Sequence, residues 1–214
     1  MRYIVGLDEV GRGPLAGPVV VAAALIMQNV KIKDKKLGIP RDSKKLTPKQ
    51  REDWVRYFEN NPKIFYAVAQ VSPRVIDKIN ISAAANLAAW RAYGRLIKKS
   101  KIHPSSNYER ASKIKNVGVF LDGGLYLKKK GFYPGAKTII KGDQKIPAIS
   151  IASIIAKVYR DDLMNKMAKK HPGYGFEIHK GYGTKAHYSA LRKLGPSEIH
   201  RLTFLGKKHK ITKS

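Results

Sequence analysis

The sequence predicts an α/β fold in which helices pack against a mixed central β-sheet, with a small helical appendage at the C-terminal end. Two observations favour this class. Short apolar runs typical of buried strands alternate along the chain with longer segments whose apolar residues repeat at helical spacing. In the last quarter, loops rich in glycine and aromatic residues replace the apolar runs. No internal repeat or linker is visible, so we expect a main domain over 1–170 and an appendage over 171–214.

Five apolar segments are expected to form the strands of the sheet: 4–7, 19–26, 64–71, 117–122 and 138–140. Helices are expected to begin at 48 and 147 and to cover 73–78, 82–99 and 185–194, with a further short element at 199–205. Thr47 is a suitable cap for the first of them, because Pro48 fits the first helical turn. The polar segment 100–116 is expected to be a surface loop, and 206–214 a disordered basic tail.

The composition favours a nucleic-acid partner. The 214 residues include 43 Lys and Arg against 15 Asp and Glu, a formal net charge of +28 at pH 7, and such a charge attracts polyanions at long range. The absence of cysteine excludes disulfides and thiolate metal sites. The sequence shows no signal peptide and no apolar stretch long enough to cross a bilayer. We therefore expect a monomeric, cytoplasmic protein without a membrane partner.

Acidic residues follow three of the predicted strands. Asp8 and Glu9 end the first apolar run, Asp122 ends the run at 117–122, and Asp143 follows 138–140. Strand ends on one edge of an α/β sheet converge, so these four carboxylates are expected to share a site. Two Mg²⁺ or Mn²⁺ ions ~4 Å apart would relieve their mutual repulsion and promote phosphodiester hydrolysis. Because neighbouring strand residues point to opposite faces, we expect the strand to end or twist at Glu9.

A glycine-rich turn follows the paired acids. Gly11 and Gly13 allow backbone N–H groups to approach a ligand closely, and Arg12 carries a planar group suited to phosphate. Pro14 and Pro18 exclude the helix that a dinucleotide-binding loop requires here, and the sequence contains no Walker-type motif. Acids followed by such a loop indicate a nuclease. On these residues alone, a plain strand and turn with solvated acids is an equal alternative.

Six segments together resemble ribonuclease HII. They lie in order and span nearly the whole chain: 8–18 (DEVGRGPLAGP), 42–46 (DSKKL), 141–143 (KGD), 149–161 (ISIASIIAKVYRD), 180–184 (KGYGT) and 195–201 (GPSEIHR). The resemblance implies a ribonuclease H-like fold and cleavage of the RNA strand of RNA–DNA hybrids. It also implies incision on the 5′ side of ribonucleotides embedded in duplex DNA, leaving a 3′-hydroxyl and a 5′-phosphate. Ribonuclease HIII shares the core but carries an N-terminal extension, which we do not expect here because Asp8 lies so near the start of the sequence.

The same resemblance implies roles for individual residues. Four match the acids that bind Mg²⁺ or Mn²⁺: Asp8, Glu9, Asp122 and Asp143. Three match the loop that reads the 2′-hydroxyl and the neighbouring phosphates: Gly11, Arg12 and Gly13. Tyr182 matches a tyrosine that stacks on the deoxyribose after the ribonucleotide.

Other side chains are interpreted from their sequence context. Three lysines are candidates for holding phosphates, although one lysine among so many is more often a surface charge: Lys44, Lys45 and Lys157. Three histidines lack the close spacing of a metal cluster and are expected on the polar surface: His171, His179 and His187. Four aromatic residues are expected to pack in cores: Trp54, Trp90, Tyr174 and Phe176. Asp161 and Asp162 rival Asp143 as ligands, but they fit surface acids with basic neighbours one helical turn away.

Two other functions compete with the metal-dependent endoribonuclease. A non-catalytic RNA- or DNA-binding protein would need only the positive charge, and a metal-dependent DNase or recombination nuclease would use the same fold and acids. Cleavage of matched duplexes with no, one or several ribonucleotides distinguishes all three.

Overall fold

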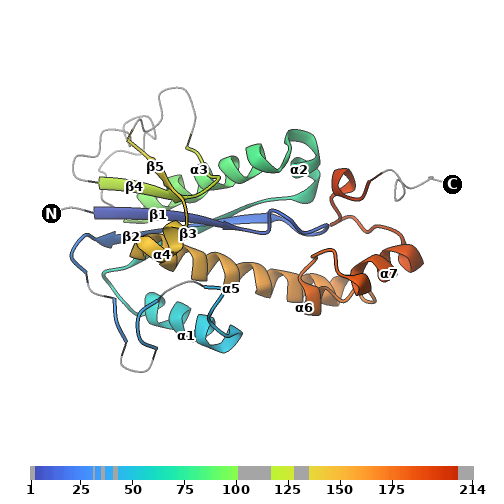
Figure 1. Ribbon diagram of the computed structural model, residues 1–214, viewed down its shortest axis with the longest axis horizontal. Helices are drawn as coiled ribbons and strands as arrows, with labels where there is room; N and C mark the ends of the chain where they lie inside the picture. Colours follow the sequence, from blue (N-terminus) through green and yellow to red (C-terminus); the bar gives the residue numbers. More distant parts are fainter. Residues whose placement is uncertain are drawn as a thin grey trace.

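A mixed β-sheet forms the middle layer of the protein. The computed structural model describes residues 3–30, 32–34, 37–40, 43–100, 117–127 and 135–206. The expected loop at 100–116 lies outside these residues except for Ser100, which belongs to a helix, and the expected tail at 206–214 lies outside them except for Gly206. Within them the sheet has five strands in the order β3-β2-β1-β4-β5 (Figure 1). The strands are β1 (Tyr3–Val10), β2 (Val19–Met27), β3 (Phe65–Val71), β4 (Val117–Asp122) and β5 (Lys137–Ile139).

The pairing of the strands confirms the predicted mixed sheet. β1 pairs with β2, and β2 with β3, in the antiparallel sense, whereas β1–β4 and β4–β5 are parallel. The pairing of β1 with β2 is longer than its pairing with β4. Its antiparallel register with β2 continues to Val10, but its parallel register with β4 stops at the Leu7–Leu121 pair. Residues 8–10 of β1 are therefore unpaired on the β4 side.

Helices cover both faces of the sheet. They are α1 (Pro48–Glu59), α2 (Pro73–Ile79), α3 (Ile81–Ser100), α4 (Gly142–Lys145), α5 (Pro147–Lys170), α6 (Phe176–His179), α7 (Lys185–Leu194) and the 3₁₀ helix η2 (Leu202–Phe204). Figure 1 shows α3 on one side of the sheet and α5 with α1 on the other. The predicted cap of α1 is confirmed, because the Thr47 side chain accepts a hydrogen bond from Gln50 in a full capping box.

Each face of the sheet has its own hydrophobic core. One core places Val5 and Leu7 of β1 against the alanine-rich face of α3. The other places β2 against α5 and α1 and includes Trp54. Gly6 allows α5 to approach β1 closely, since a Cβ at this position would lie 2.2 Å from the Ala148 backbone carbon. The expected packing of Trp54 and Trp90 is confirmed, with Trp54 fully buried and Trp90 partly buried. The close contact between Gly6 and Ala148 fixes the position of α5 relative to β1.

The appendage after α5 packs on the turn between β1 and β2. A third core joins its aromatic residues to Leu15, Ala16 and Met164. Backbone hydrogen bonds connect the two parts directly, from Arg201 N to Leu15 O (2.8 Å) and from Leu15 N to Gly181 O (2.8 Å). The appendage therefore contacts the same turn that carries the Gly-Arg-Gly loop. Among the described residues, no helix combines the length and apolar character needed to span a membrane.

Candidate active site

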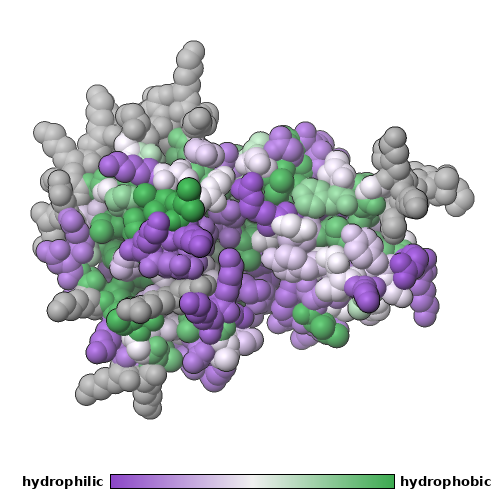
Figure 2. Space-filling model, in the orientation of Figure 1, coloured by the Kyte–Doolittle hydropathy of each residue, from purple (hydrophilic) through white to green (hydrophobic). Residues whose placement is uncertain are grey.

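An acidic pocket lies where β1 and β4 end, beside α4, α5 and the loop at 180–184. Its volume is about 710 Å³. The pocket is lined by all four predicted acids and by part of the predicted substrate-binding set: Asp8, Glu9, Asp122, Asp143, Lys44, Lys157 and Tyr182. On the face of the molecule that Figure 2 shows, hydrophilic residues gather across the middle, around α4 and along α5. Gly11, Arg12, Gly13 and Lys45 do not line the pocket.

Asp8 and Glu9 both reach this pocket although they are neighbours on a strand. The strand was expected to end at Glu9 or to twist there, but β1 continues to Val10. What ends is its pairing with β4, at Leu7, which leaves the β4 side of Asp8 and Glu9 open. The Glu9 backbone N–H donates to Asp8 Oδ1 at 2.7 Å and so holds the first carboxylate. The strand edge, rather than the end of the strand, provides the room for both acids.

Asp122 and Asp143 approach from the neighbouring strands. Asp122 is the last residue of β4, as expected, and its Oδ1 accepts a hydrogen bond of 2.7 Å from Gly142 N. Asp143 was expected at a strand end, but it lies in the short helix α4, after β5 has ended at Ile139. The bond to Gly142 therefore connects one acid to the backbone next to the other. It holds α4, and with it Asp143, against the end of β4.

The electrostatics of the pocket oppose negative charge. Asp8 is 6% exposed, and burial raises the pKa of its carboxyl well above the usual value, helped by the charge of Glu9, while a hydrogen bond from Ser153 acts in the opposite direction. Burial also raises the pKa of Glu9 to about 7, with Arg12 lowering it and Asp122 adding to the rise. Glu9 Oε2 is buried and has no hydrogen-bond partner among the described residues. Arg12 approaches the other oxygen of this carboxyl, Oε1, at 3.6 Å.

The donor set fits a divalent cation shared with a substrate. Hard cations such as Mg²⁺ and Mn²⁺ take oxygen ligands, and the pocket offers four carboxylates. Within the described chain, no three acidic or histidine side chains are already gathered closely enough to hold one ion by themselves. Mg²⁺ is commonly bound through one or two carboxylates together with substrate phosphates. The four carboxylates are therefore the residues that would hold such a cation.

Cationic groups stand beside the acids. Lys157 Nζ contacts Asp161 Oδ1 at 2.8 Å, and Asp161 also lies 3.7 Å from Arg51. Asp161 is thus occupied by basic side chains, as expected of a rival that does not join the acids, and Asp162 is exposed. Lys45 is exposed outside the pocket. Four further polar residues line the pocket, and sequence reasoning assigned a role to none of them, although Ser43, Lys141 and Ser153 lie inside the quoted motifs: Ser43, Lys141, Gln144 and Ser153.

The Gly-Arg-Gly loop lies next to the pocket, and contacts with other parts of the fold hold it in place. The Arg12 side chain donates to Gly124 O (3.3 Å) and to Ser82 Oγ (3.2 Å), and its guanidinium lies 3.6 Å from Glu9. Gly11 has a φ of +88°, and a Cβ there would lie 2.3 Å from Arg160 Nε, so only glycine fits. Around Gly13, by contrast, a Cβ would meet only open space.

Two buried arginines fix this turn, and sequence reasoning gave neither a role. Arg201 donates to Gly11 O (2.6 Å), Arg12 O (2.8 Å) and Gly17 O (2.9 Å). Arg160 donates to Pro18 O, Ala16 O and Lys180 O at 3.0–3.2 Å. The available signal was a charged residue inside the apolar pattern of α5 and another beside a histidine in the appendage. A planar guanidinium with five donors suits several backbone carbonyls at once.

The appendage contributes Tyr182 and a buried aromatic core. Tyr182 is 41% exposed and lines the pocket, with the Arg160 guanidinium 5.8 Å from the centre of its ring. Tyr174 and Phe176 stack at 5.2 Å in the third core, which confirms the expectation that they pack. The expectation of surface histidines was wrong for His179 and His187, which are buried in this core. Only His171 stays partly exposed.

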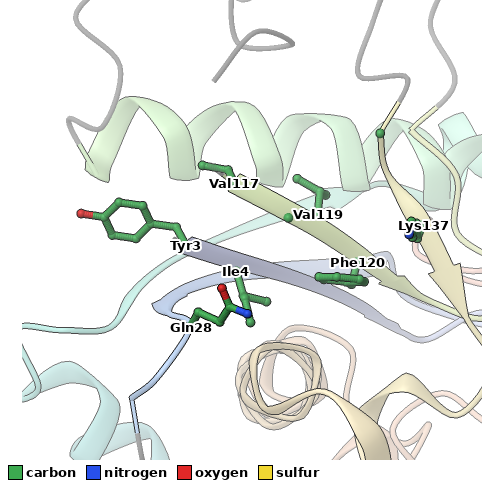
Figure 3. Close-up of a pocket in the computed structure, with 9 residues that line it drawn as sticks. Tyr3, Ile4, Gln28, Val117, Val119, Phe120 and Lys137 are labelled. Carbon is green, nitrogen blue, oxygen red and sulfur yellow. The ribbon is translucent and has the colours of Figure 1, made fainter. Parts of the chain in front are cut away.

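A second pocket lies at the other ends of β1 and β4. Its volume is about 430 Å³, and its lining includes Ile4, Gln28, Phe120 and Lys137. Figure 3 shows Ile4, Gln28 and Phe120 on the same side of these strands. None of the four acids lines it. The larger pocket is therefore the candidate active site.

Comparison with known proteins identifies the family of this chain. The family model described as Ribonuclease HII matches residues 5–207. A ribonuclease HII of Caldicellulosiruptor bescii is 46% identical over 206 residues, covering 95% of this chain and 87% of that protein. The ribonuclease H2 of Pyrococcus horikoshii OT3 superposes with a TM-score of 0.66 at 25% identity, covering 94% of this chain and 93% of that one. Bst-RNase HIII, solved in complex with Mn²⁺, has a TM-score of 0.59 at 18% identity, covering 90% and 70%.

The fold and the acidic pocket define a nuclease of the ribonuclease H type. The match of the family model and of the relatives decides among the members of this type. The chain belongs to the ribonuclease HII family, and it is a ribonuclease H that cleaves the RNA strand of RNA–DNA hybrids. Membership of this family argues against the two competing interpretations, a non-catalytic binding protein and a DNase or recombination nuclease.

Proposed function

We propose that the acidic pocket carries out metal-dependent hydrolysis, and that its substrates include single ribonucleotides embedded in duplex DNA as well as RNA–DNA hybrids. The products would be a 3′-hydroxyl and a 5′-phosphate. The observation that carries this proposal is the pair Asp8 and Glu9, buried with raised pKa values beside Asp122. Burial of the Asp8 and Glu9 carboxylates destabilises a fold, so their place in this pocket favours a functional role over a structural one.

The four acids would hold Mg²⁺ or Mn²⁺. Bst-RNase HIII, a protein of the same fold, was solved with Mn²⁺. When bound, such a cation would supply Lewis-acid polarisation of the phosphodiester and a water of lowered pKa. The unpartnered Glu9 Oε2 is an oxygen able to accept it. Ser153 and the Glu9 backbone N–H keep Asp8 oriented toward the pocket.

The remaining lining residues would place the nucleic acid. Lys157, held by Asp161, and Lys44 stand at the rim of the acidic pocket, where a phosphate would offset their charge. Lys45 is exposed outside the pocket and would act on phosphates further along the strand. The Gly-Arg-Gly loop lies beside the pocket, and Gly13 has open space through which a sugar or phosphate approaches the backbone.

Tyr182 would read the boundary between a ribonucleotide and the following deoxyribonucleotide. Its ring is exposed into the pocket and sits on a loop fixed by backbone hydrogen bonds. A ring packed against a sugar leaves no room for a 2′-hydroxyl, which is the only mark that distinguishes the two sugars.

Cleavage of matched duplexes tests this function. Duplexes of one sequence would contain no, one or several ribonucleotides, and the cut sites would be mapped with Mg²⁺, with Mn²⁺ and with a chelator. We expect one cut on the 5′ side of the single ribonucleotide, none in the all-DNA duplex and none with chelator. Cutting of the all-DNA duplex, or a cut on the 3′ side, would contradict the proposal.

A further inference from the structure

Three histidines of the appendage form a buried cluster that the hydrolysis described above does not use. His179, His187 and His200 are 9%, 0% and 3% exposed. The rings of His179 and His187 stack at 4.4 Å, and Phe176 meets His187 edge-on at 5.5 Å. No cluster of metal-binding type occurs in the described part of the chain. Hydrogen bonds, rather than a metal ion, must therefore satisfy the ring nitrogens of these three histidines.

Hydrogen bonds assign the proton positions in two of these rings. The Ser197 backbone N–H donates to His200 Nδ1 at 2.9 Å, so this nitrogen carries no proton and the proton of a neutral ring is on Nε2. His200 Nε2 lies 3.0 Å from His187 Nε2, which must then accept. The proton of His187 is consequently on Nδ1, which donates to Tyr182 O at 2.9 Å.

Both rings are held neutral by their surroundings. Burial lowers the pKa of His187, and burial together with His187 lowers the pKa of His200 to about 4. A second proton on His187 would bring two N–H groups face to face across the 3.0 Å contact, and a second proton on His200 would oppose the Ser197 backbone N–H at Nδ1. The chain of bonds is therefore complete and one-directional, from the Ser197 backbone to the Tyr182 carbonyl.

This series of hydrogen bonds ends on the loop that carries Tyr182, the tyrosine that lines the acidic pocket. Three consecutive carbonyls of the loop are held, and the first two do not depend on histidine. Arg160 donates to Lys180 O at 3.0 Å, and Leu15 N donates to Gly181 O at 2.8 Å. The third, Tyr182 O, accepts from Thr184 N at 2.8 Å and from His187. The histidine contact thus acts on the backbone of the residue whose ring enters the pocket.

We propose that His187 and His200 are positioning residues, whose chain of hydrogen bonds sets the place of the Tyr182 ring and so the selectivity for a ribonucleotide followed by deoxyribose. This inference rests on the proposed function of Tyr182. A role confined to packing the appendage would lower activity on every substrate equally. A positioning role instead lowers the ratio of cleavage of the single-ribonucleotide duplex to cleavage of an all-RNA strand in a hybrid.

Two substitutions of one residue separate the roles. His187→Asn places an amide nitrogen at the position of Nδ1 and keeps a donor toward Tyr182, whereas His187→Gln places it at Nε2 and loses that donor. We expect His187→Gln to lower the ratio of kcat/KM values about tenfold, the effect of one ordinary hydrogen bond, and His187→Asn to restore most of it. His171→Gln alters a histidine that does not belong to this series of hydrogen bonds, and it should leave the ratio of kcat/KM values unchanged.

Tyr182→Ala distinguishes failure of this inference from failure of the proposed function. If Tyr182→Ala leaves the ratio unchanged, Tyr182 does not read the junction and both ideas fall. If Tyr182→Ala lowers the ratio but His187→Gln does not, only the positioning role is overturned. In the Tyr182→Ala background, His187→Gln should have no further effect on the ratio, because the two act through one contact.

The wild-type protein provides a test that needs no variant. Nitrogen-15 NMR of the histidine rings distinguishes the two neutral forms. We expect the proton on Nδ1 in His187 and on Nε2 in His200 at neutral pH. A His187 ring protonated on Nε2 would break the chain before Tyr182 and overturn the inference.

Discussion

Replacing Glu9 by glutamine should stabilise the metal-free protein at neutral pH. The Glu9 side chain is 9% exposed, and its pKa rises from 4.5 to about 7 in the folded chain. A carboxyl with a raised pKa binds more protons folded than unfolded between these two values, so the free energy of unfolding falls as the pH rises through this range. At about 1.4 kcal/mol for each pKa unit, the loss reaches at most about 3 kcal/mol above pH 7. Glutamine carries no such charge.

Denaturant unfolding in the presence of a chelator measures this effect. We expect the wild type and Glu9→Gln to be similarly stable near pH 4.5, and the variant to become more stable by up to about 3 kcal/mol at pH 8. Glu52→Gln, at an exposed position of α1, should show no such growth of the difference. Mg²⁺ or Mn²⁺ should stabilise the wild type more than Glu9→Gln, because binding to the folded state raises stability. A stability difference that does not change with pH would refute the reasoning about Glu9.

Three further predictions concern the acids, the charge and the buried arginine. Asp8→Asn and Asp143→Asn should each lower turnover by several orders of magnitude while duplex binding in a gel-shift assay survives; near wild-type turnover would remove that acid from the site. Substrate affinity should fall by about 10³-fold or more between about 50 and about 200 mM salt if six or more phosphates are contacted, and a flat salt profile would contradict this. Arg201→Met should lower the free energy of unfolding by about 2–5 kcal/mol, because three buried carbonyls lose their donor; a loss below about 0.5 kcal/mol would show that other groups hold the turn.

Most of the secondary structure could be predicted because its signals are local. The apolar run at 19–26 and the proline at 147 correspond closely to β2 and to the start of α5. Thr47 followed by Pro48 and Gln50 contains the whole cap of α1 within four residues. Such signals depend only on neighbours in the sequence. The acids at the ends of β1 and β4 were predictable for the same reason.

The misplaced features depend on contacts between distant segments. Asp143 follows a strand of only three residues, and the hydrogen bond from Gly142 to Asp122, rather than the strand, brings it to the pocket. The burial of His187 depends on His200 and Phe176, neither of which is its neighbour in sequence. A histidine on a short polar helix is ordinarily exposed, and only the packed appendage reverses that.

The roles of the buried arginines were also beyond local pattern. Arg201 lies at the far end of the chain from Gly11, and a single sequence does not show which carbonyls it serves. Arg201 holds the carbonyls of Gly11 and Arg12 in the loop that borders the pocket. The same contact makes the appendage part of the loop's support.

Binding of Mn²⁺ to the substrate-free and substrate-bound protein tests the central claim most directly. Titration followed by electron paramagnetic resonance would compare the wild type with Asp8→Asn and Asp143→Asn, using cleavage-resistant duplex as the substrate. The exposed acid of α5 provides the control Asp162→Asn. We expect binding to strengthen with the duplex, to weaken in both pocket variants and to be unchanged in the control. Undiminished Mn²⁺ binding in Asp8→Asn and Asp143→Asn would contradict a metal-dependent site built from these acids.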